Sequence, residues 1–453
     1  MTTATQQISQ NIVNAPRSLM LIGGKAVESS DGRFIDVENP ATRTVIASVP
    51  RGTEADVDAA VRAAVAAFEA WKRVTPKDRG RMLLRIADLV EAETESIART
   101  VALETGNAIR TQARPEVKSS AEVIRYYGGL TGETKGETVP LGEHVLSYTR
   151  REPIGVVGGI VPWNAPVVLG TLKIAMAIAA GNTLVLKAAE DAPLGLLRVA
   201  QLCNEHLPPG VLNLLTGYGE ETGAALARHP LVRKLSFTGS TEVGKLIMHA
   251  AADRIVPVSL ELGGKSPAIV FPDVDEQRTV DGVITGMRVT RQGQSCTAGS
   301  RLFLHRSIFD SFVSKLTATL QKLKIGDPSD EATDMGAIIN RKQFDRVIGE
   351  FQALQHRAAE LFCDLELTRA IVRQALQAVD EGAKNAPLLV AQAKARACLT
   401  ANRAVQEGVQ MHGGIGVTDE LDMGLFMKRA RVLQELFGDA AVQIDRAAVM
   451  AGY

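Results

Sequence analysis

Residues 155–187, GVVGGIVPWNAPVVLGTLKIAMAIAAGNTLVLK, hold a short apolar run, a longer apolar run that starts after a proline, and a second short run. Short runs rich in valine, leucine and isoleucine are typical of buried strands, and the longer central run fits a helix. The same alternation of short and long segments continues to about residue 270. Strands that alternate with helices of ten or more residues predict βαβ units, so we expect an α/β fold with a parallel sheet.

The segments on either side of this alternation have other patterns. Residues 21–50 alternate apolar and polar positions around GG and DG turns, which predicts a small antiparallel element. Alanines and valines then recur at helical spacing, and three helices are expected at about 54–71, 76–102 and 115–127. Strand patterns stop near residue 341. Long helices are expected after it, at 343–379, 384–411 and 420–449.

Composition bounds the class of protein. The chain has 453 residues, of which 45% are hydrophobic, and its 51 basic residues equal its 51 acidic ones. This balance argues against nucleic acid or an anionic membrane as a partner. The start of the chain has no apolar signal segment, and the most apolar stretch carries Lys173 and is too short to span a bilayer. We therefore expect a cytoplasmic, soluble protein.

Four cysteines, Cys203, Cys296, Cys363 and Cys398, lie far apart, without the spacing of a metal site. Most lone cysteines are small buried hydrophobic residues, and Cys203, on an apolar helix, fits that description. Cys296 differs because it lies in QGQSCTAG, residues 292–299, among small and polar neighbours. It is a candidate nucleophile, although a structural role stays open on these residues alone.

Three further stretches have chemical potential, each with a plainer alternative. Glu261, in SLELGGK, is a carboxylate at a strand end, which could equally be a solvated charge. VPWNAP places Trp163 and Asn164 between two prolines, as in any rigid turn with a packed indole. TGSTEVG follows a strand and opens a helix, where backbone N–H groups can bind phosphate, but a strand–helix turn needs no ligand. The fingerprint GxGxxG is absent.

Taken in order, PWNAP, LKAAE, FTGSTEVG, LELGGKSP and GQSCTAGSR resemble the aldehyde dehydrogenase superfamily over about residues 20–350. The resemblance implies a Rossmann-like parallel sheet and oxidation of a small-molecule aldehyde to a carboxylic acid. It makes Cys296 the nucleophile, Asn164 and the Cys296 N–H the oxyanion donors, and Glu261 the base that activates water.

The resemblance also implies a cofactor. NAD is expected rather than NADP, because the carboxylate of Glu190 would repel a 2′-phosphate. Lys187 and Glu190 would bind the adenosine ribose, and Gly239 and Ser240 the diphosphate. The full set of residues that the resemblance places at the cofactor is Ile160, Val161, Pro162, Trp163, Lys187, Glu190, Gly219, Gly239, Ser240 and Leu262.

The chain departs from that family after about residue 350. The EIFGP-like segment, whose glutamate holds the nicotinamide ribose, is absent. Instead FQALQHRAAELF, VQMHGGIGVTDE and MKRARVLQELFGDAA resemble the C-terminal helical domain of acyl-CoA dehydrogenases over about residues 351–450. This second resemblance makes Gln410, Gly413 and Gly414 candidate remnants of an FAD site, although a glycine turn between helices explains them as well. Phe437 stands where many members place a catalytic carboxylate.

The two resemblances together divide the chain. Its expected parts are a mobile arm (1–20), an NAD-binding domain (21–262), an incomplete α/β catalytic domain (263–350) and an all-helical C-terminal bundle segment (351–453). The leading hypothesis is an NAD-dependent aldehyde dehydrogenase, impaired by truncation. The alternatives are a flavin-linked acyl-CoA oxidoreductase component and an inactive fusion product that serves only as a helical association module. A homo-oligomer through the C-terminal helices is expected.

Overall fold

A computed structural model describes residues 16–412 and 423–453. Contacts between residues divide the chain into two compact units, Met1–Gln343 and Phe344–Tyr453, and each is described by itself. No helix within the described ranges is both long and apolar enough to cross a membrane.

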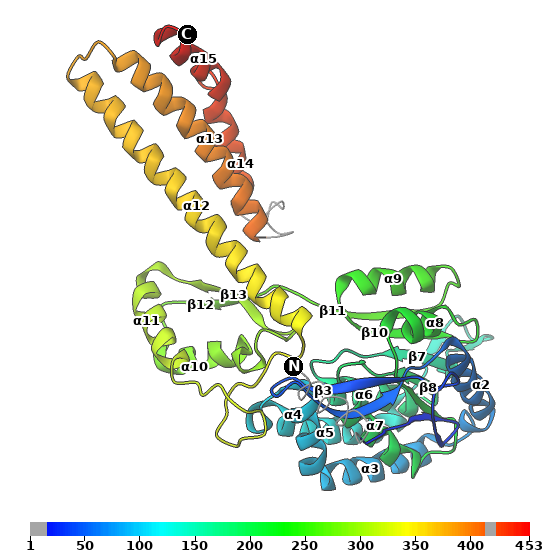
Figure 1. Ribbon diagram of the computed structural model, residues 1–453. Coiled ribbons are helices and arrows are strands. Elements are labelled where there is room, and N and C mark those ends of the chain that lie inside the picture. Colours follow the sequence, from blue (N-terminus) through cyan, green and yellow to red (C-terminus); the bar gives the residue numbers. More distant parts are fainter. Residues whose placement is uncertain (1–15, 413–422) are drawn as a thin grey trace. The chain divides into compact units, whose positions relative to one another are not determined.

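The first unit is built on a seven-stranded sheet with the order β11-β10-β7-β8-β9-β1-β2 (Figure 1). β7 to β11 are parallel to one another, whereas β1 pairs antiparallel with β9 and with β2. The predicted α/β fold with a parallel sheet is therefore confirmed. The strands are β1 (Met20–Ile22), β2 (Lys25–Val27), β7 (Val156–Ile160), β8 (Thr183–Lys187), β9 (Leu212–Leu215), β10 (Lys234–Gly239) and β11 (Val258–Leu262).

Helices cover both faces of this sheet. One face packs against α2 (Glu54–Trp71), α8 (Ala224–Arg228) and α9 (Thr241–Ala252). The other packs against α3 to α7, and all residues of β7, β8 and β9 are buried. Burial on both faces explains why these strands read as continuous apolar runs. The helices of the second face are α3 (Pro76–Ala92), α4 (Thr94–Thr105), α5 (Arg114–Leu130), α6 (Pro166–Ala179) and α7 (Leu194–Asn204).

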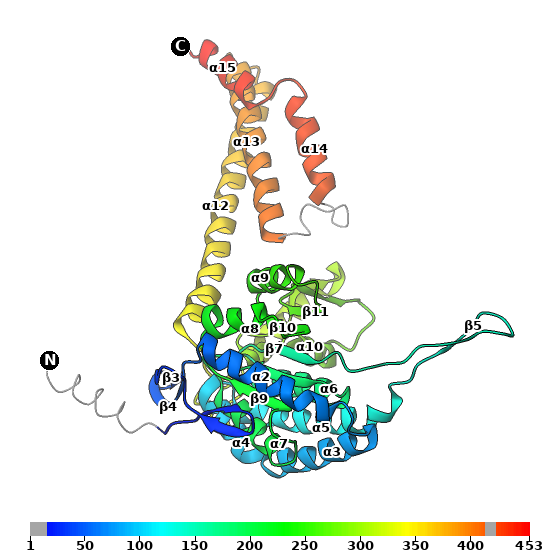
Figure 2. The same cartoon turned by 90° about the vertical axis from the view of Figure 1, so that its right-hand side faces the viewer.

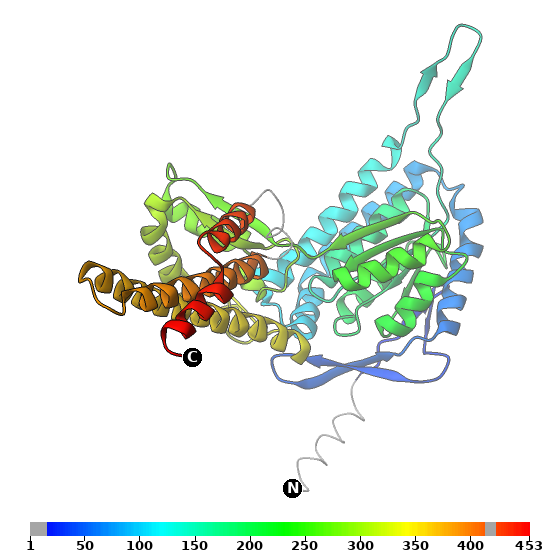
Figure 3. The same ribbon diagram turned by 90° about the horizontal axis from the view of Figure 1, so that it is seen from above.

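Smaller elements complete the first unit. β12 (Ser266–Val270) and β13 (Gly299–Leu304) form a parallel pair, with α10 (Glu276–Gly286) and α11 (Phe309–Leu320) around a small core. The hairpin of β5 and β6 projects away from the helices of the first unit (Figures 2 and 3). The remaining elements are β3 (Phe34–Asn39), β4 (Thr44–Pro50), β5 (Thr138–Pro140), β6 (Leu146–Tyr148), η1 (Ile109–Ala113), η2 (Thr131–Glu133), η3 (Gly219–Gly223), η4 (Val289–Arg291) and η5 (Arg306–Ile308).

Two details of the first unit differ from the sequence prediction. The antiparallel element expected at 21–50 is divided, because β1 and β2 join the large sheet while β3 and β4 pair separately. The helix expected at 76–102 breaks into α3 and α4 at Glu93, whose backbone leaves the helical region at φ −95° and ψ 15°.

The second unit starts within α12 (Arg341–Asp380) at Phe344. It continues with α13 (Ala386–His412), α14 (Met423–Glu435) and α15 (Ala440–Met450). The single helix predicted at 420–449 is therefore wrong. The break falls at LFGD, where Phe437 and Gly438 adopt positive φ angles of 65° and 94°. Asp439 then caps α15, because its carboxylate accepts the Val442 N–H at 3.0 Å.

A buried carboxylate joins two helices of the first unit. Glu104, at the end of α4, is fully buried and accepts the backbone N–H groups of Leu194 and Gly195 at 2.6 and 2.9 Å. Leu194 and Gly195 begin α7, so the Glu104 carboxylate accepts two of the backbone N–H groups that have no partner within that helix. Burial outweighs the two hydrogen bonds and raises the pKa of Glu104 to about 8.

We predict that Glu104→Gln reduces the loss of stability with rising pH. A carboxyl pKa raised from 4.5 to about 8 by folding makes a contribution that is complete below pH 4.5 and is lost up to pH 8. From pH 6 to pH 8 the variant should gain about 2 kcal/mol relative to the parent in unfolding free energy. Urea unfolding at both pH values measures this. Exposed Glu122 provides the control, Glu122→Gln, and an equal gain there would contradict the assignment.

Candidate active site

The predicted site residues gather at one edge of the large sheet. The parallel register places Ile160 of β7 beside Lys187 of β8 and Phe237 of β10. In the same direction, Gly239 of β10 lies beside Leu262 of β11. Ligands of open α/β sheets bind outside the carboxyl ends of the strands, and this edge is that end.

Cys296 is exposed in a loop between the turn η4 and β13. The chain reaches it through tight turns, because Arg288, Gln292 and Gly293 all adopt φ angles between 54° and 75°. Positive φ is uncommon for residues with side chains, so surrounding contacts must hold this loop in place.

Asn164 is one of those contacts. Its Nδ2 donates to the backbone oxygen of Gln294 at 2.9 Å, two residues before Cys296. Its own backbone oxygen accepts hydrogen bonds from Asn107 Nδ2 and Arg291 Nη1, both at 3.1 Å. The amide predicted as an oxyanion donor is thus joined directly to the loop that carries the candidate nucleophile.

Glu261 lies near the end of β11, is exposed, and pairs in register with Thr238 of β10. The chain then turns through two glycines. A methyl group built on Gly264 would lie 3.9 Å from the backbone oxygen of Cys296. The end of β11, which carries the candidate base, therefore lies next to residues 292–298, the loop that carries Cys296. This loop is called the nucleophile loop.

Lys173 was overlooked in the sequence as a site residue. It is a buried cation on α6, and its Nζ donates to Ser236 and Thr238 of β10, both at 3.0 Å. Burial lowers the pKa of Lys173 to about 8, while the nearby Glu261 carboxylate opposes this shift. The signal in the sequence is a single lysine within an otherwise apolar helix.

A second overlooked group is a buried ionic cluster beside the nucleophile loop. The Arg291 guanidinium donates to Gln112 Oε1 and lies 3.8 Å from Glu116 Oε2. Burial raises the pKa of Glu116 to about 7, and Arg291 opposes the shift. Burial also lowers the pKa of Arg291, again opposed by its partner. No local pattern in the sequence marks these residues as neighbours.

The residues expected at the adenosine and diphosphate fit those groups. Lys187 Nζ and Glu190 Oε2 form an ion pair at 2.6 Å at the end of β8. Ser240 caps α9 by accepting the Val243 N–H at 3.3 Å, so this helix directs its N-terminal donors to the same edge. A side chain at Gly239 would come within 2.5 Å of the Phe237 ring, so only glycine fits there.

The other predicted cofactor residues lie close to this edge. Val161 is buried and its N–H donates to the backbone oxygen of Lys187 at 3.2 Å, whereas Pro162 and Trp163 are half-buried. Gly219 begins η3, with open space where a side chain would be. Leu262 contacts Gly244 of α9.

The suggested FAD remnants fall at the margin of the described residues. Gly413 and Gly414 lie outside the described residues, as does the side chain of Gln410. Phe437, at the position of the carboxylate in the second resemblance, is 83% exposed.

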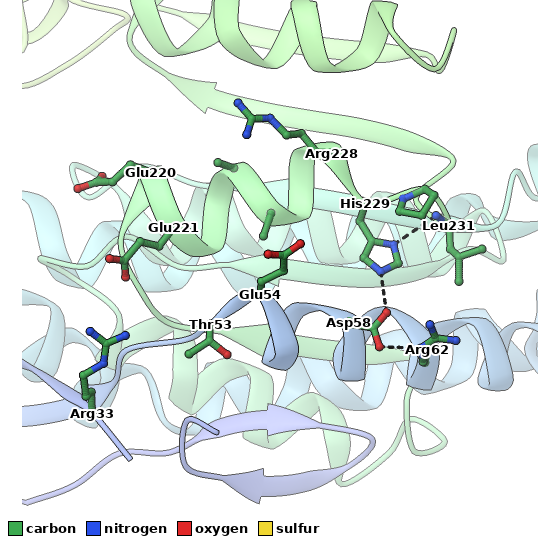
Figure 4. Close-up of a pocket in the computed structure, with 13 residues that line it drawn as sticks. Arg33, Thr53, Glu54, Asp58, Arg62, Glu220, Glu221, Arg228, His229 and Leu231 are labelled. Carbon is green, nitrogen blue, oxygen red and sulfur yellow. Dashed lines mark hydrogen bonds and ion pairs between the residues drawn. The ribbon is translucent and has the colours of Figure 1, made fainter. Parts of the chain in front are cut away.

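A separate groove of about 740 Å³ lies between α2 and α8 (Figure 4). In it His229 points toward Asp58, with Nε2 and Oδ1 3.3 Å apart, and Arg62 Nε donates to Asp58 Oδ2 at 2.6 Å. None of the predicted catalytic residues lines this groove, so it is distinct from the candidate active site.

Comparisons with known proteins decide the family. The sequence pattern of the aldehyde dehydrogenase family matches residues 26–402. The chain belongs to this family. It is 42% identical over 353 residues to a phenylacetaldehyde dehydrogenase of Pseudomonas fluorescens, covering 76% of this chain and 70% of that one. An aldehyde dehydrogenase of Emericella nidulans is also 42% identical, over 332 residues, covering 73% and 66%.

Solved aldehyde dehydrogenases share the fold. The NAD+ complex of the enzyme from Bacillus cereus has a TM-score of 0.73 and 39% identity, over 76% of this chain and 70% of that one. An NAD-dependent enzyme from Sinorhizobium meliloti has a TM-score of 0.71 and 37% identity, over 74% and 67%. The predicted class of enzyme is confirmed, and the chain spans about two thirds of the length of these relatives.

The family match corrects one boundary drawn from the resemblances. It extends to residue 402, past the predicted end near residue 350, and so overlaps the segment assigned to acyl-CoA dehydrogenases. That assignment gains no support from these comparisons.

We predict that iodoacetamide labels Cys296 and Cys363 and spares the other two cysteines. Cys203 and Cys398 are buried, and burial raises the pKa of the Cys203 thiol to about 12. Millimolar benzaldehyde should slow labelling of Cys296 alone, since only a thiol in a carbonyl site is captured by the aldehyde. Peptide mapping with time measures both rates, with Cys363 as the internal control. Equal protection of the two exposed thiols would argue against a site at Cys296.

Proposed function

We propose that this chain oxidises an aldehyde to a carboxylic acid with NAD, through covalent catalysis by Cys296. The observation that carries the proposal is the hydrogen bond of 2.9 Å from Asn164 Nδ2 to the Gln294 carbonyl. It places the amide of the PWNAP motif against the loop of the GQSCTAGSR motif, which carries Cys296. The end of β11, with Glu261, meets the same loop.

In the first step the Cys296 thiolate adds to the carbonyl carbon and forms a thiohemiacetal. Negative charge moves onto the former carbonyl oxygen. Asn164 Nδ2 has two hydrogens, of which one is used by Gln294. The other, together with the Cys296 N–H, is available to the oxyanion, and each such donor contributes roughly 3 kcal/mol.

NAD, when bound, supplies the acceptor for the hydride that leaves this carbon. The chain holds its adenosine end with Lys187 and Glu190 and its diphosphate with the start of α9. Glu190 pairs with Lys187 at 2.6 Å and remains partly exposed, so its carboxylate can accept ribose hydroxyl hydrogens. The same charge disfavours a 2′-phosphate, so NAD is preferred to NADP.

Glu261 acts as the general base for the second half of the reaction. It takes a proton from water, which then attacks the Cys296 thioester and releases the acid. Its exposure gives the water access. The buried Lys173 lies close enough to this carboxylate for an electrostatic interaction, which opposes the lowering of the Lys173 pKa by burial.

Turnover is expected to be low. The sequence has no EIFGP segment to hold the nicotinamide ribose. A misplacement of about 1 Å between reacting groups can cost on the order of a hundredfold in rate. Binding of NAD should suffer less, since the residues proposed for it lie at or before Leu262.

We predict that Cys296→Ala abolishes formation of NADH, and that Glu261→Gln slows steady turnover about 100-fold or more. Because Glu261 acts after hydride transfer, its variant should retain a rapid first turnover followed by a slow phase. Rapid-mixing absorbance at 340 nm with benzaldehyde and NAD separates the phases. Cys363→Ala, the same change at the other exposed thiol, should match the parent. Activity that survives Cys296→Ala would sink the proposal.

We also propose that the C-terminal helices serve association between copies of the chain. Among the described side chains of Phe344–Tyr453, the buried apolar residues are only alanines and Cys398. Polar contacts also join α12 to α13, because Asp364 is bonded to Arg396 and Arg403 and Thr368 to Thr400. A unit with so small an apolar core has little hydrophobic stabilisation of its own.

Many of the large apolar side chains described in this unit are exposed, and the others are half-buried. On α12 a row spaced by three and four residues starts at Phe362 (63% exposed), includes Leu376 (61% exposed) and ends at Val379. This spacing is that of a coiled-coil seam. The row consists of Phe362, Leu365, Arg369, Val372, Leu376 and Val379.

We predict that Leu376→Glu shifts the oligomer towards monomer. A leucine at the centre of a buried seam contributes roughly 1.5–3 kcal/mol, and a charge there adds a desolvation cost, so the dissociation constant should rise about 100-fold. Leu367→Glu is the matched control, because Leu367 is 58% exposed on the same helix but outside the row. Light scattering after size exclusion, over a range of concentrations, measures the shift. A monomeric parent protein, or equal effects of the two changes, would contradict the seam.

A further inference from the structure

Resting on the function proposed above, we propose that Arg291 is a positioning residue for the oxyanion donor Asn164. Arg291 ends the turn η4, five residues before Cys296. Its guanidinium is the point at which the nucleophile loop, the PWNAP loop and the helix α5 meet.

Each nitrogen of the guanidinium has its own partner. Nη1 donates to the backbone oxygen of Asn164 at 3.1 Å, and Nε donates to Gln112 Oε1. Nη2 lies 3.8 Å from Glu116 Oε2, an atom with no hydrogen-bond partner of its own. Because the fork is planar and rigid, three partners in fixed directions leave it one orientation.

Glu116 extends this restraint to the other side of Asn164. Its Oε1 accepts the N–H groups of Val167 and Val168, which open α6 three and four residues after Asn164. Arg291 thus holds the Asn164 carbonyl directly. Its charge also lies beside the Glu116 carboxylate, and this carboxylate anchors the start of α6. The Asn164 amide then reaches Gln294, in the same loop as Arg291, and closes a ring of contacts.

The arrangement serves the site by fixing the position of Asn164, and not by the charge of Arg291. Arg291 is 9% exposed and Glu116 3% exposed, so the cluster is a buried ion pair. Buried pairs are weak sources of stability but hold their partners in one geometry. Loss of an oxyanion donor costs roughly 100- to 1000-fold in rate. Releasing the Asn164 carbonyl should cost a comparable factor, near 100-fold.

A different role is also possible for the same cation. Arg291 interacts electrostatically with the Cys296 thiol, as well as with Glu116 and Arg288. If its charge acted on the thiol, every reaction of Cys296 would be slowed alike. If it acts through Asn164, only reactions that form an oxyanion are slowed. Two reagents separate these roles without NAD or the missing nicotinamide contacts.

The first reagent is 4-nitrophenyl acetate. The thiolate adds to its carbonyl, the electron pair moves to oxygen as an oxyanion, and collapse breaks the ester C–O bond. 4-Nitrophenolate leaves, the acetyl group stays on sulfur as a thioester, and the thiol proton goes to solvent. The second reagent, iodoacetamide, is attacked at a saturated carbon, where sulfur displaces iodide and no oxyanion forms.

The experiment compares the full-length parent, Arg291→Met and the control Arg288→Met. Arg288 is exposed beside the same turn, so the control removes a neighbouring positive charge but leaves the three partners of the Arg291 guanidinium in place. We expect Arg291→Met to slow the nitrophenolate burst about 100-fold and alkylation of Cys296 less than threefold. The control should match the parent in both. An unchanged burst, or equal slowing of both reactions, would overturn the proposal.

Two additions keep the test decisive. If Arg291→Met does not fold, Arg291→Lys retains the charge but replaces the planar three-nitrogen fork with a single nitrogen, and should still slow the burst about tenfold; a parental rate would overturn the proposal. Guanidinium ion at tens of millimolar should speed the burst of Arg291→Met and not that of Asn164→Ala. A parent burst that persists in Cys296→Ala would instead refute the proposed nucleophile, and the inference with it.

Discussion

The hydrogen bond from the Asn164 amide to the Gln294 carbonyl joins the two parts on which the site depends. Asn164 lies between β7 and α6 of the large sheet, whereas Gln294 belongs to the loop before β13 of the small one. Other long-range contacts secure the same junction, including Gln294 Oε1, which accepts the Ile339 N–H at 3.1 Å. The loop that carries Cys296 is therefore held from several sides.

The parallel sheet and its edge could be predicted from the sequence for a physical reason. Strands buried on both faces must be apolar at every position, and the sequence from Gly155 to Lys187 has that pattern around a helix. Since parallel strands all end on one side, residues at their ends must gather there. Lys187, Gly239 and Leu262 do so. The roles proposed for them toward NAD rest on the resemblance to family motifs, because periodicity carries no information about a ligand.

The buried charges could not be predicted in this way. Glu104, Glu116 and Lys173 lie on helices whose local sequences do not show which polar residue faces inward. Each is accepted in the interior because a group far along the chain meets it: backbone N–H groups for the carboxylates, and hydroxyl groups of β10 for the lysine. Arg291 is the extreme case, since its partners lie 127 and 179 residues away.

In the C-terminal helices, periodicity predicted helix formation but neither one helix boundary nor the face that packs inward. Helical spacing correctly predicted α12 and α13 but joined α14 to α15. Gly438, which adopts φ 94°, separates the two helices, and a single glycine does not interrupt the apolar pattern of the sequence. Periodicity also does not reveal which of two rows on one helix is used within the unit. On α12 the row of Asp364, Thr368 and Ala375 packs inward, and the more apolar row that includes Leu376 does not. This exposed row is the basis for the proposed association between copies of the chain, and none of its residues belongs to the set proposed for the chemistry at Cys296.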